Sequence, residues 1–439
     1  MSFVGRPKKS PAIVYDILRL FLAVSDRTPR GIDRVDLAYA RFLFGSWSGD
    51  CSGTLPTPWG LRLFDRAAVL RGLDRIETFW SETIHTSHDV TLSEVKRQLA
   101  GKPLPDDCIR QTDRRSAFWK LQRFLGLLSA TGLSLGKSVV RAAPRDALYI
   151  NVGQLGWAAP WMTAWLHHRP DIRAIFMIHD MIPLDRPELV AGPGPWSHGR
   201  MIDTAARHAA GIISTTDAAA ASVQQALQRR GRPDIAVETM KLPVAAIFLE
   251  RPAPDPILTD RNYFVACGAI EPRKNLGLLL NIWRKLVAQH GDRAPKLVIA
   301  GSLGRGGQPI LQAFADCTEL RNHVIVARGL SSPALRDLMA HATALLMPSL
   351  AEGFGLPIIE ALSLGTPVLA SAIPAHLEVG GDLAVFCDPT DEAAWFREIT
   401  RLSNGGDAIA RLRQRIAGYE PTTAGQHQQQ IARFLRTFA

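Results

Sequence analysis

The stretch PSLAEGFGLPIIEA, residues 348–361, decides the fold of this chain. The four residues before it, 344–347, are all apolar, which is typical of a strand buried on both faces. Pro357 suits the first turn of a helix, so the stretch indicates a strand end, a glycine-containing loop and a helix start. Such a loop brings backbone N–H groups and the positive end of a helix dipole toward an anion such as phosphate.

Two carboxylates stand eight positions apart in this stretch, Glu352 in the loop and Glu360 in the helix that follows. A carboxylate accepts hydrogen bonds from two hydroxyls, which suits a sugar or a ribose diol. The alternative interpretation is an ordinary surface turn that carries two solvated acids.

The rest of the second part of the chain alternates between short apolar runs and segments of helical spacing. This alternation predicts a parallel sheet covered by helices on both faces, with ligands bound beyond the carboxyl ends of the strands. The expected strands are 263–267, 296–300, 323–326, 344–347, 368–370 and 384–386, and the expected helices are 276–289, 333–341 and 357–364.

The first part of the chain follows the same logic less clearly. The segment RPAPDP, residues 251–256, has three prolines in five positions and is the best candidate for a linker. We expect an N-terminal domain over 1–251, with a poorly defined insertion at about 50–145. A C-terminal domain should cover 257–415, and a helix within 416–439 should pack back toward the N-terminal domain. The expected N-terminal strands are 13–15, 148–151, 174–178 and 211–214, and the expected helices are 32–44, 160–167 and 217–228.

The loop and its two carboxylates resemble the E-x7-E motif of retaining glycosyltransferases with the GT-B fold, family 4, also called group 1. The flanking Gly-Phe-Gly-Leu-Pro fits as well, and the likeness is good over about 260–400. The resemblance implies an α/β fold of two Rossmann-like domains facing across a cleft. It also implies that Glu352 contacts the donor sugar and Glu360 the nucleotide ribose. The expected donor contacts in the same loop are Gly353, Phe354, Gly355 and Leu356.

A second segment, GAIEPRKN at 268–275, follows the first strand of the C-terminal part. Two adjacent cations, Arg273 and Lys274, are unfavourable at a helix start unless they bind an anion such as a diphosphate. By resemblance Lys274 is the family lysine, and Gly268 joins the donor site. The family arginine is absent because Ala269 stands in its place, so Arg273 is the candidate replacement. A solvated basic turn is the alternative for Arg273.

Three further residues enter the expected site by resemblance. His179, in IHDMIP at 178–183, follows a strand and either bonds the donor sugar or holds local backbone. Gly31 begins a helix whose backbone N–H groups would meet the diphosphate. Leu330 follows another strand, where the family places the nucleotide base. His179, Glu352 and Lys274 are the expected catalytic residues.

Composition excludes several classes of protein. The 439 residues contain no apolar run of 18, no signal-peptide pattern and no nucleic-acid-binding signature. The five cysteines are scattered without metal-ligand spacing, which favours a reduced, cytoplasmic setting. The chain has no Asp-x-Asp, the usual metal-holding motif of sugar transferases, so we expect neither a metal nor a cofactor besides the donor substrate.

The positive charge is concentrated at 96–145, where eleven Lys or Arg face three Asp, a net +8 of the chain's +10. Such a segment favours an anionic partner, here an anionic membrane surface. Residues 117–128 have apolar residues at helical spacing, which fits either an interfacial helix or a helix packed on the core. A location at the inner face of the plasma membrane would follow from the first interpretation.

The resemblance implies transfer of a hexose with retention of configuration in bacterial polysaccharide synthesis. It favours GDP-mannose as donor and a glycan or polyprenyl-diphosphate-linked acceptor. Two alternatives stay open, a non-catalytic nucleotide-sugar-binding relative and a nucleotide-sugar epimerase of the same fold.

Overall fold

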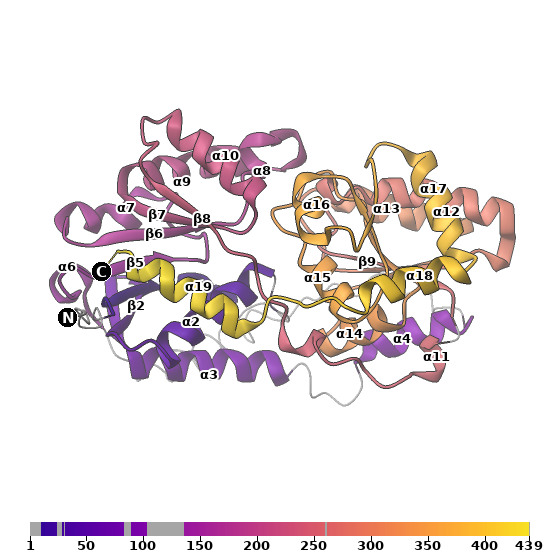
Figure 1. Ribbon diagram of the computed structural model, residues 1–439, viewed down its shortest axis with the longest axis horizontal. Coiled ribbons are helices and arrows are strands. Elements are labelled where there is room, and N and C mark those ends of the chain that lie inside the picture. The colour runs from indigo at the N-terminus through magenta and orange to yellow at the C-terminus, as the bar shows by residue number, and fades with distance from the viewer. Residues whose placement is uncertain are drawn as a thin grey trace, which may run out of the picture.

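The computed structural model describes residues 10–23, 29, 31–82, 89–102, 136–259 and 261–438. These residues form two α/β domains that lie side by side (Figure 1). The N-terminal domain is coloured indigo to magenta and the C-terminal domain orange, while the yellow C-terminal helix lies on the N-terminal domain. Each domain is built on its own sheet.

The N-terminal sheet has the strand order β4-β3-β2-β1-β5-β6-β7-β8 in the described residues. Its neighbours pair in parallel, except that β3 runs antiparallel to both β2 and β4. The strands are β1 (Ile13–Asp16), β2 (Cys51–Thr57), β3 (Gly60–Asp65), β4 (Lys137–Ser138), β5 (Leu148–Asn151), β6 (Arg173–Ile178), β7 (Ala209–Ser214) and β8 (Ala236–Thr239).

Successive residues of a strand point to opposite faces of this sheet, as β geometry requires. Ile13 and Tyr15 of β1 pack into one core, while Val14 packs into another. The helices that cover the two faces, with the short turns between them, are α1 (Leu18–Ala23), α2 (Gly31–Gly45), α3 (Arg66–Glu82), α6 (Val139–Ala142), α7 (Pro160–Thr163), η2 (Ala164–His168), α8 (Ile182–Asp185), η3 (Pro187–Leu189), α9 (Gly194–His208) and α10 (Asp217–Gln228).

The C-terminal sheet is parallel throughout, with the order β11-β10-β9-β12-β13-β14. Its strands are β9 (Tyr263–Cys267), β10 (Lys296–Ala300), β11 (Val324–Ala327), β12 (Ala344–Met347), β13 (Val368–Ser371) and β14 (Val385–Cys387). Its helices and turns are η4 (Ala246–Phe248), α11 (Pro256–Thr259), η5 (Pro272–Lys274), α12 (Leu276–His290), η6 (Gly291–Arg293), α13 (Gln308–Asp316), η7 (Thr318–Leu320), α14 (Ser332–His341), α15 (Leu356–Ser363), α16 (Pro374–Gly380), α17 (Glu392–Ser403) and α18 (Asp407–Ile416).

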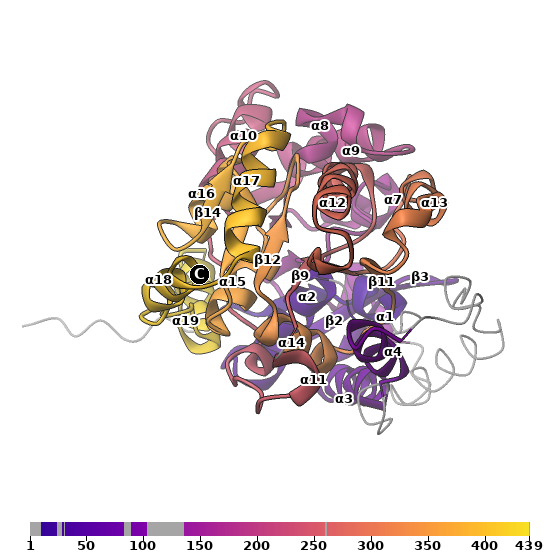
Figure 2. The same ribbon diagram turned by 90° about the vertical axis from the view of Figure 1, so that its right-hand side faces the viewer.

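Helices cover both faces of the C-terminal sheet, with α12 and α17 on one side and α14 on the other (Figure 2). The apolar residues beneath α14 and α15 are continuous with one of the two N-terminal cores. The two domains therefore share one hydrophobic core along one side.

Most of the expected strands are confirmed, because strands buried on both faces are apolar throughout. Those at 148–151, 263–267, 296–300 and 344–347 have the bounds that the sequence predicts. The single helix expected at 160–167 is wrong in detail, since α7 ends at Thr163 and a 3-10 turn follows to His168.

The described parts of the segment at 50–145, expected as an insertion, pack on two different domains. Its first residues form β2 and β3, which extend the N-terminal sheet beyond β1. Helix α4 (Val90–Leu99) instead packs against β11 and α11 of the C-terminal domain (Figure 1). Lys96 of α4 forms an ion pair of 2.5 Å with Asp255, and Lys296 donates to the Gln98 carbonyl at 2.5 Å. The helix expected at 117–128 lies outside the described residues.

The last helix, α19 (Ala424–Arg436), lies on the N-terminal domain. The His427 ring meets the Tyr39 ring edge to face, with the ring centres 5.3 Å apart. The guanidinium of Arg436 lies 5.7 Å from the centre of the Trp47 ring. None of the helices in the described ranges is long and apolar enough to cross a membrane.

Candidate active site

The loop between β12 and α15 lies against the N-terminal domain. Thr215 and Thr216 donate side-chain hydrogen bonds to the Gly353 carbonyl, at 3.2 and 3.1 Å. Gly355 caps α15 with φ near 102°, a left-handed conformation that glycine adopts without strain. The E-x7-E loop is thus fixed by hydrogen bonds from the neighbouring domain.

Glu352 is the anionic centre of the loop, and its side chain is only 8% exposed. One carboxylate oxygen accepts from Arg273 Nη1 at 2.6 Å, and the other accepts from Lys274 Nζ and from Ser349 Oγ at 2.8 Å. Burial opposes ionisation of this carboxyl, but Lys274 and Arg273 outweigh it and hold its pKa well below the usual range. Glu352 is therefore ionised at neutral pH, and its two oxygens are fixed.

Arg273 and Lys274 come from η5, the single turn that follows β9. The next residue, Asn275, has φ of 53°, and this left-handed step ends η5 and begins α12. Arg273 also pairs with Glu271 at 2.7 Å, so two carboxylates balance the two cations. The four charged side chains sum to zero.

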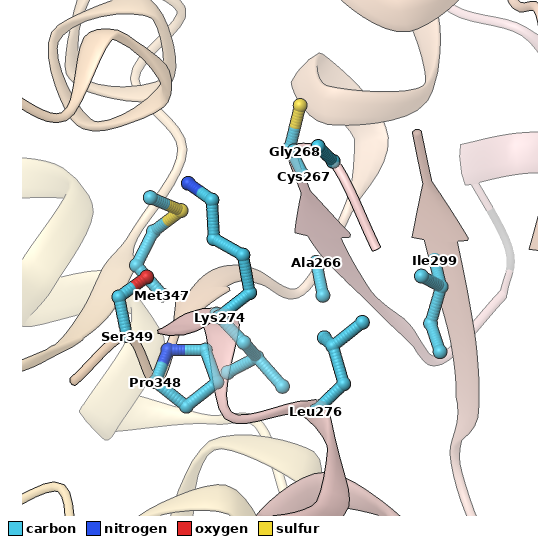
Figure 3. A pocket seen from close by; sticks show the side chains of 11 residues that line it. Ala266, Cys267, Gly268, Lys274, Leu276, Ile299, Met347, Pro348 and Ser349 are labelled. Carbon is cyan, nitrogen blue, oxygen red and sulfur yellow. The ribbon is translucent and has the colours of Figure 1, made fainter. Parts of the chain in front are cut away.

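A small cavity of about 10 Å³ lies where Cys267 and Gly268, Lys274, and the residues from Met347 to Ser349 meet. Figure 3 shows the Lys274 side chain extending past Met347 and Ser349. A Cβ at Gly268, whose φ is 137°, would lie 3.0 Å from Lys274 Nζ. Ligand sites for molecules of nucleotide size measure hundreds of cubic ångströms, so a nucleotide would have to displace side chains here.

Glu360 is 1% exposed and does not face solvent. Its Oε1 accepts from Nη1 of Arg34, which is on α2 of the N-terminal domain, at 2.8 Å. Nearby, a Cβ at Gly31 would lie 3.1 Å from Leu356 Cδ1. The first turns of α2 and α15 therefore pack against each other, which places Gly31, Leu356 and Glu360 together.

His179 follows β6 and is 6% exposed. Its Nε2 lies 2.8 Å from the Val152 carbonyl, so this nitrogen carries the proton and donates. Burial lowers the pKa of His179 to about 4, which makes the ring neutral at pH 7. The structure thus shows His179 holding local backbone, one of the two roles expected for it. Asp180 accepts from the Ile182 backbone N–H at 3.1 Å and caps the following turn.

The remaining expected contacts lie close to the same loops. Phe354 is buried in the core that the two domains share. Leu330 is half-buried and packs against the same core. Thr91, just inside α4, donates to the Arg328 carbonyl at 3.2 Å, and Asp89 accepts from the Ser331 N–H at 2.8 Å. The strand end at Leu330 is therefore lined by a segment from the first part of the chain.

Sequence reasoning missed three residues at this site: Arg34, His376 and Glu378. His376 is fully buried beside Gly355, and burial lowers its pKa to about 4. Glu378 of α16 accepts from the backbone N–H groups of Asp217 and Ala218 at the start of α10, at 2.8 to 3.4 Å. Arg34 follows Gly31 by three positions on α2, but nothing in the sequence pairs it with a residue 326 positions away.

We expect Gly353→Ala to weaken the contact between the domains. The added Cβ would lie 2.4 Å from the His179 carbonyl oxygen and 2.8 Å from Asp180 Cβ, distances that real Cβ atoms do not reach. A clash with backbone costs about 1–3 kcal/mol. We expect the weakened contact to appear as faster hydrogen–deuterium exchange at 209–217. Small-angle scattering should also give a larger radius of gyration. Gly277→Ala, with open space around its Cβ, is the control; equal behaviour of the two variants would contradict the prediction.

Residues 250–420 match the family model described as glycosyl transferases group 1. Among curated proteins, the chain is 33% identical over 162 residues to the O-antigen chain mannosyltransferase RfbU of Salmonella typhimurium, a match that covers 36% of this chain and 43% of the relative. It is 34% identical over 134 residues to the O-antigen chain mannosyltransferase B of Escherichia coli, covering 30% of this chain and 35% of that protein. The chain thus spans less than half the length of either relative.

Two solved structures share the fold over nearly the whole chain. Anabaena HepE in complex with UDP has a TM-score of 0.58 at 14% identity, covering 97% of this chain and 100% of that one. Sucrose-phosphate synthase from Thermosynechococcus elongatus has a TM-score of 0.57 at 15% identity, covering 97% and 98%. At such identities the likeness concerns the fold alone. Together with the family match, it shows that this chain has the GT-B fold and that its residues 250–420 are similar to the group 1 glycosyltransferases.

Proposed function

We propose that this protein transfers a hexose, preferably mannose, from a nucleotide-diphosphate sugar to a hydroxyl of a glycan or polyprenyl-diphosphate-linked acceptor. The observation that carries the proposal is the contact of ionised Glu352 with Arg273 and Lys274 at the strand ends of a parallel sheet. Relatives named as O-antigen mannosyltransferases support mannose as the sugar and bacterial polysaccharide as the product.

The charge balance suggests how the donor would bind. Arg273 and Lys274 are neutralised by Glu352 and Glu271, so a diphosphate has to compete with these carboxylates for the two cations. When the phosphate oxygens take over the cations, Glu352 becomes available to accept hydrogen bonds from sugar hydroxyls. The same exchange would enlarge the small cavity beside Lys274. Donor binding and rearrangement of the cluster are then one event.

The transfer itself needs little covalent chemistry from the protein. The bond between the anomeric carbon and the diphosphate oxygen breaks, and a bond to the acceptor oxygen forms on the same face of the sugar, with retention. The acceptor proton goes to the departing phosphate oxygen, whose growing charge Lys274 and Arg273 stabilise. Neutral His179 keeps the Val152 loop in place and exchanges no proton.

We further propose that no divalent metal takes part and that the donor is GDP-mannose. Two fixed cations that contact the sugar-binding carboxylate can supply the charge that a metal would bring. The acceptor would be met at an anionic membrane surface, through the basic residues of 96–145 on the cytoplasmic side.

The test is a binding screen followed by turnover. Thermal unfolding is measured with GDP-mannose, UDP-glucose, UDP-N-acetylglucosamine and dTDP-rhamnose, and transfer is then followed by mass spectrometry of a polyprenyl-diphosphate disaccharide. We expect GDP-mannose to raise the unfolding midpoint most and transfer to survive excess EDTA with less than about a twofold change. A tenfold loss restored by Mg²⁺ would refute metal independence. Binding without transfer would indicate a non-catalytic relative, and conversion of the donor without acceptor an epimerase.

A further inference from the structure

A partly buried ion pair joins the two domains near the loop of Glu352. Arg34, in the first turns of α2, donates from Nη1 to Glu360 Oε1 at 2.8 Å. The Arg34 side chain is 27% exposed and the Glu360 side chain 2%. Because the Glu360 side chain is the buried partner, loss of Arg34 would leave its carboxyl group without this opposite charge.

Each side chain of this pair has a buried polar atom without a hydrogen-bond partner among the described residues. Oε2 of Glu360 and Nε of Arg34 are both buried, and neither has a hydrogen-bond partner among the described residues. Buried carboxylate oxygens are rarely left in this state, and each such group calls for an explanation. A carboxyl oxygen of this kind can accept a hydrogen bond from a hydroxyl group.

The unpartnered oxygen is on α15, the helix that begins directly after the loop of Glu352. Cys267 lines the small cavity together with Lys274 and Ser349. Burial and, after it, the Glu360 carboxylate raise the pKa of the Cys267 thiol to about 12, against the opposing effect of Lys274 and Arg34. The Cys267 thiol, at the end of β9, therefore interacts electrostatically with both Glu360 and Lys274.

Arg34 is itself held in place from two sides. Its guanidinium carbon lies 6.0 Å from the centre of the buried Phe248 ring in η4. The start of its helix packs on Leu356 through Gly31. The guanidinium can therefore fix the Glu360 carboxylate only while α2 and α15 are in contact.

We propose that Arg34 is a positioning residue that orients Glu360 so that Oε2 receives a ribose hydroxyl of the nucleotide. The proposal rests on the function proposed above and adds that the N-terminal domain takes part in recognising the ribose. Ribose binding then depends on contact between the domains, because Oε2 is held in position only while Arg34 of the N-terminal domain pairs with Glu360. The ligand feature that is recognised is the 2′,3′-diol of a nucleoside diphosphate.

The experiment compares each nucleoside diphosphate with its 2′-deoxy form by isothermal titration calorimetry, using GDP with 2′-deoxy-GDP and UDP with 2′-deoxy-UDP. We expect the wild-type protein to prefer the ribose form about tenfold, as loss of one hydrogen bond to a charged group implies. Arg34→Gln and Glu360→Gln should each reduce this preference to less than about twofold, and the double variant should lose no more. Arg34→Lys should recover part of it.

Arg41→Gln is the matched control, because Arg41 lies on the same helix and pairs with Asp74 and Glu77 away from the site. It should keep the wild-type preference. If Arg34→Gln binds GDP or UDP with the wild-type ratio of ribose to deoxyribose affinity, the role of Arg34 is overturned while the proposed function stands. If the wild-type protein binds neither nucleotide, both the function and the inference fall.

Discussion

Glu352→Gln should lower the rate of sugar transfer by about a thousandfold, the scale on which fixed electrostatic groups act at a reacting centre. The carboxylate contacts Arg273, Lys274 and Ser349, and it is ionised because the two cations outweigh its burial. An amide has one acceptor oxygen and would turn an NH2 group toward one of the cations. The variant therefore loses both the charge balance of the cluster and an acceptor for the sugar hydroxyls. Steady-state kinetics with the donor found by the binding screen measures the loss.

Glutamine suits this test better than alanine. Alanine would leave two partly buried cations without their shared partner, which costs several kcal/mol of stability and confuses function with folding. The control is Glu271→Gln, since the Glu271 carboxylate also pairs with Arg273, at 2.7 Å, while Glu271 meets Lys274 through its backbone carbonyl, which the substitution keeps. It should lose less than about tenfold in rate. A Glu352→Gln protein that folds normally and keeps a tenth of the wild-type rate would rule out the assigned role.

Lys274→Met should reduce transfer on a similar scale, by about a thousandfold, and mainly through kcat. Methionine keeps most of the apolar stem against Met347 and Ser349 but removes the ammonium group, which in the proposed mechanism stabilises the departing diphosphate. Because that charge grows as the sugar–phosphate bond breaks, donor binding should weaken less than the rate falls. Separate measurement of donor affinity by calorimetry and of kcat distinguishes the two effects.

Lys274→Arg should also be inactive, although it keeps the charge. The cavity beside Lys274 measures only about 10 Å³, so a planar guanidinium does not fit without moving Gly268 or Glu352. Lys285→Met is the control, because Lys285 is an exposed lysine on α12 that pairs with Glu392. If Lys274→Met lowered donor affinity and left kcat unchanged, Lys274 would serve binding alone.

The C-terminal sheet and the main cluster of the site could be predicted from sequence for one physical reason. Strands buried on both faces are apolar throughout, and the residues after parallel strands meet at one edge of the sheet. Lys274 and Glu352 are 78 positions apart, yet each follows such a strand, so their meeting was predictable. The roles expected for Lys274 and Glu352 came from the family resemblance, because a pattern of apolar residues predicts structure and not chemistry.

Other parts could not be predicted because they depend on contacts between distant surfaces. β2 contains Gly53 and Pro56, poor strand formers, and its place in the sheet comes from pairing with β1 and β3. The spacing of α4 indicates a helix but does not say which domain it covers. The pairing of Arg34 with Glu360 arises only from docking of α2 on α15, and no local pattern encodes it.

The position of α4 has a consequence for protein engineering. A hybrid enzyme made by exchanging everything after the proline-rich linker between two relatives would separate α4 from the surface of β11 and α11 that it covers. The partner's surface would meet a foreign helix, and the hydrogen bond from Lys296 to the Gln98 carbonyl would be lost unless the partner also has a donor at that position. A working chimera needs a discontinuous exchange, in which residues 89–102 travel with the C-terminal domain. In this chain, the structural unit formed by the C-terminal domain and α4 is not one continuous stretch of sequence.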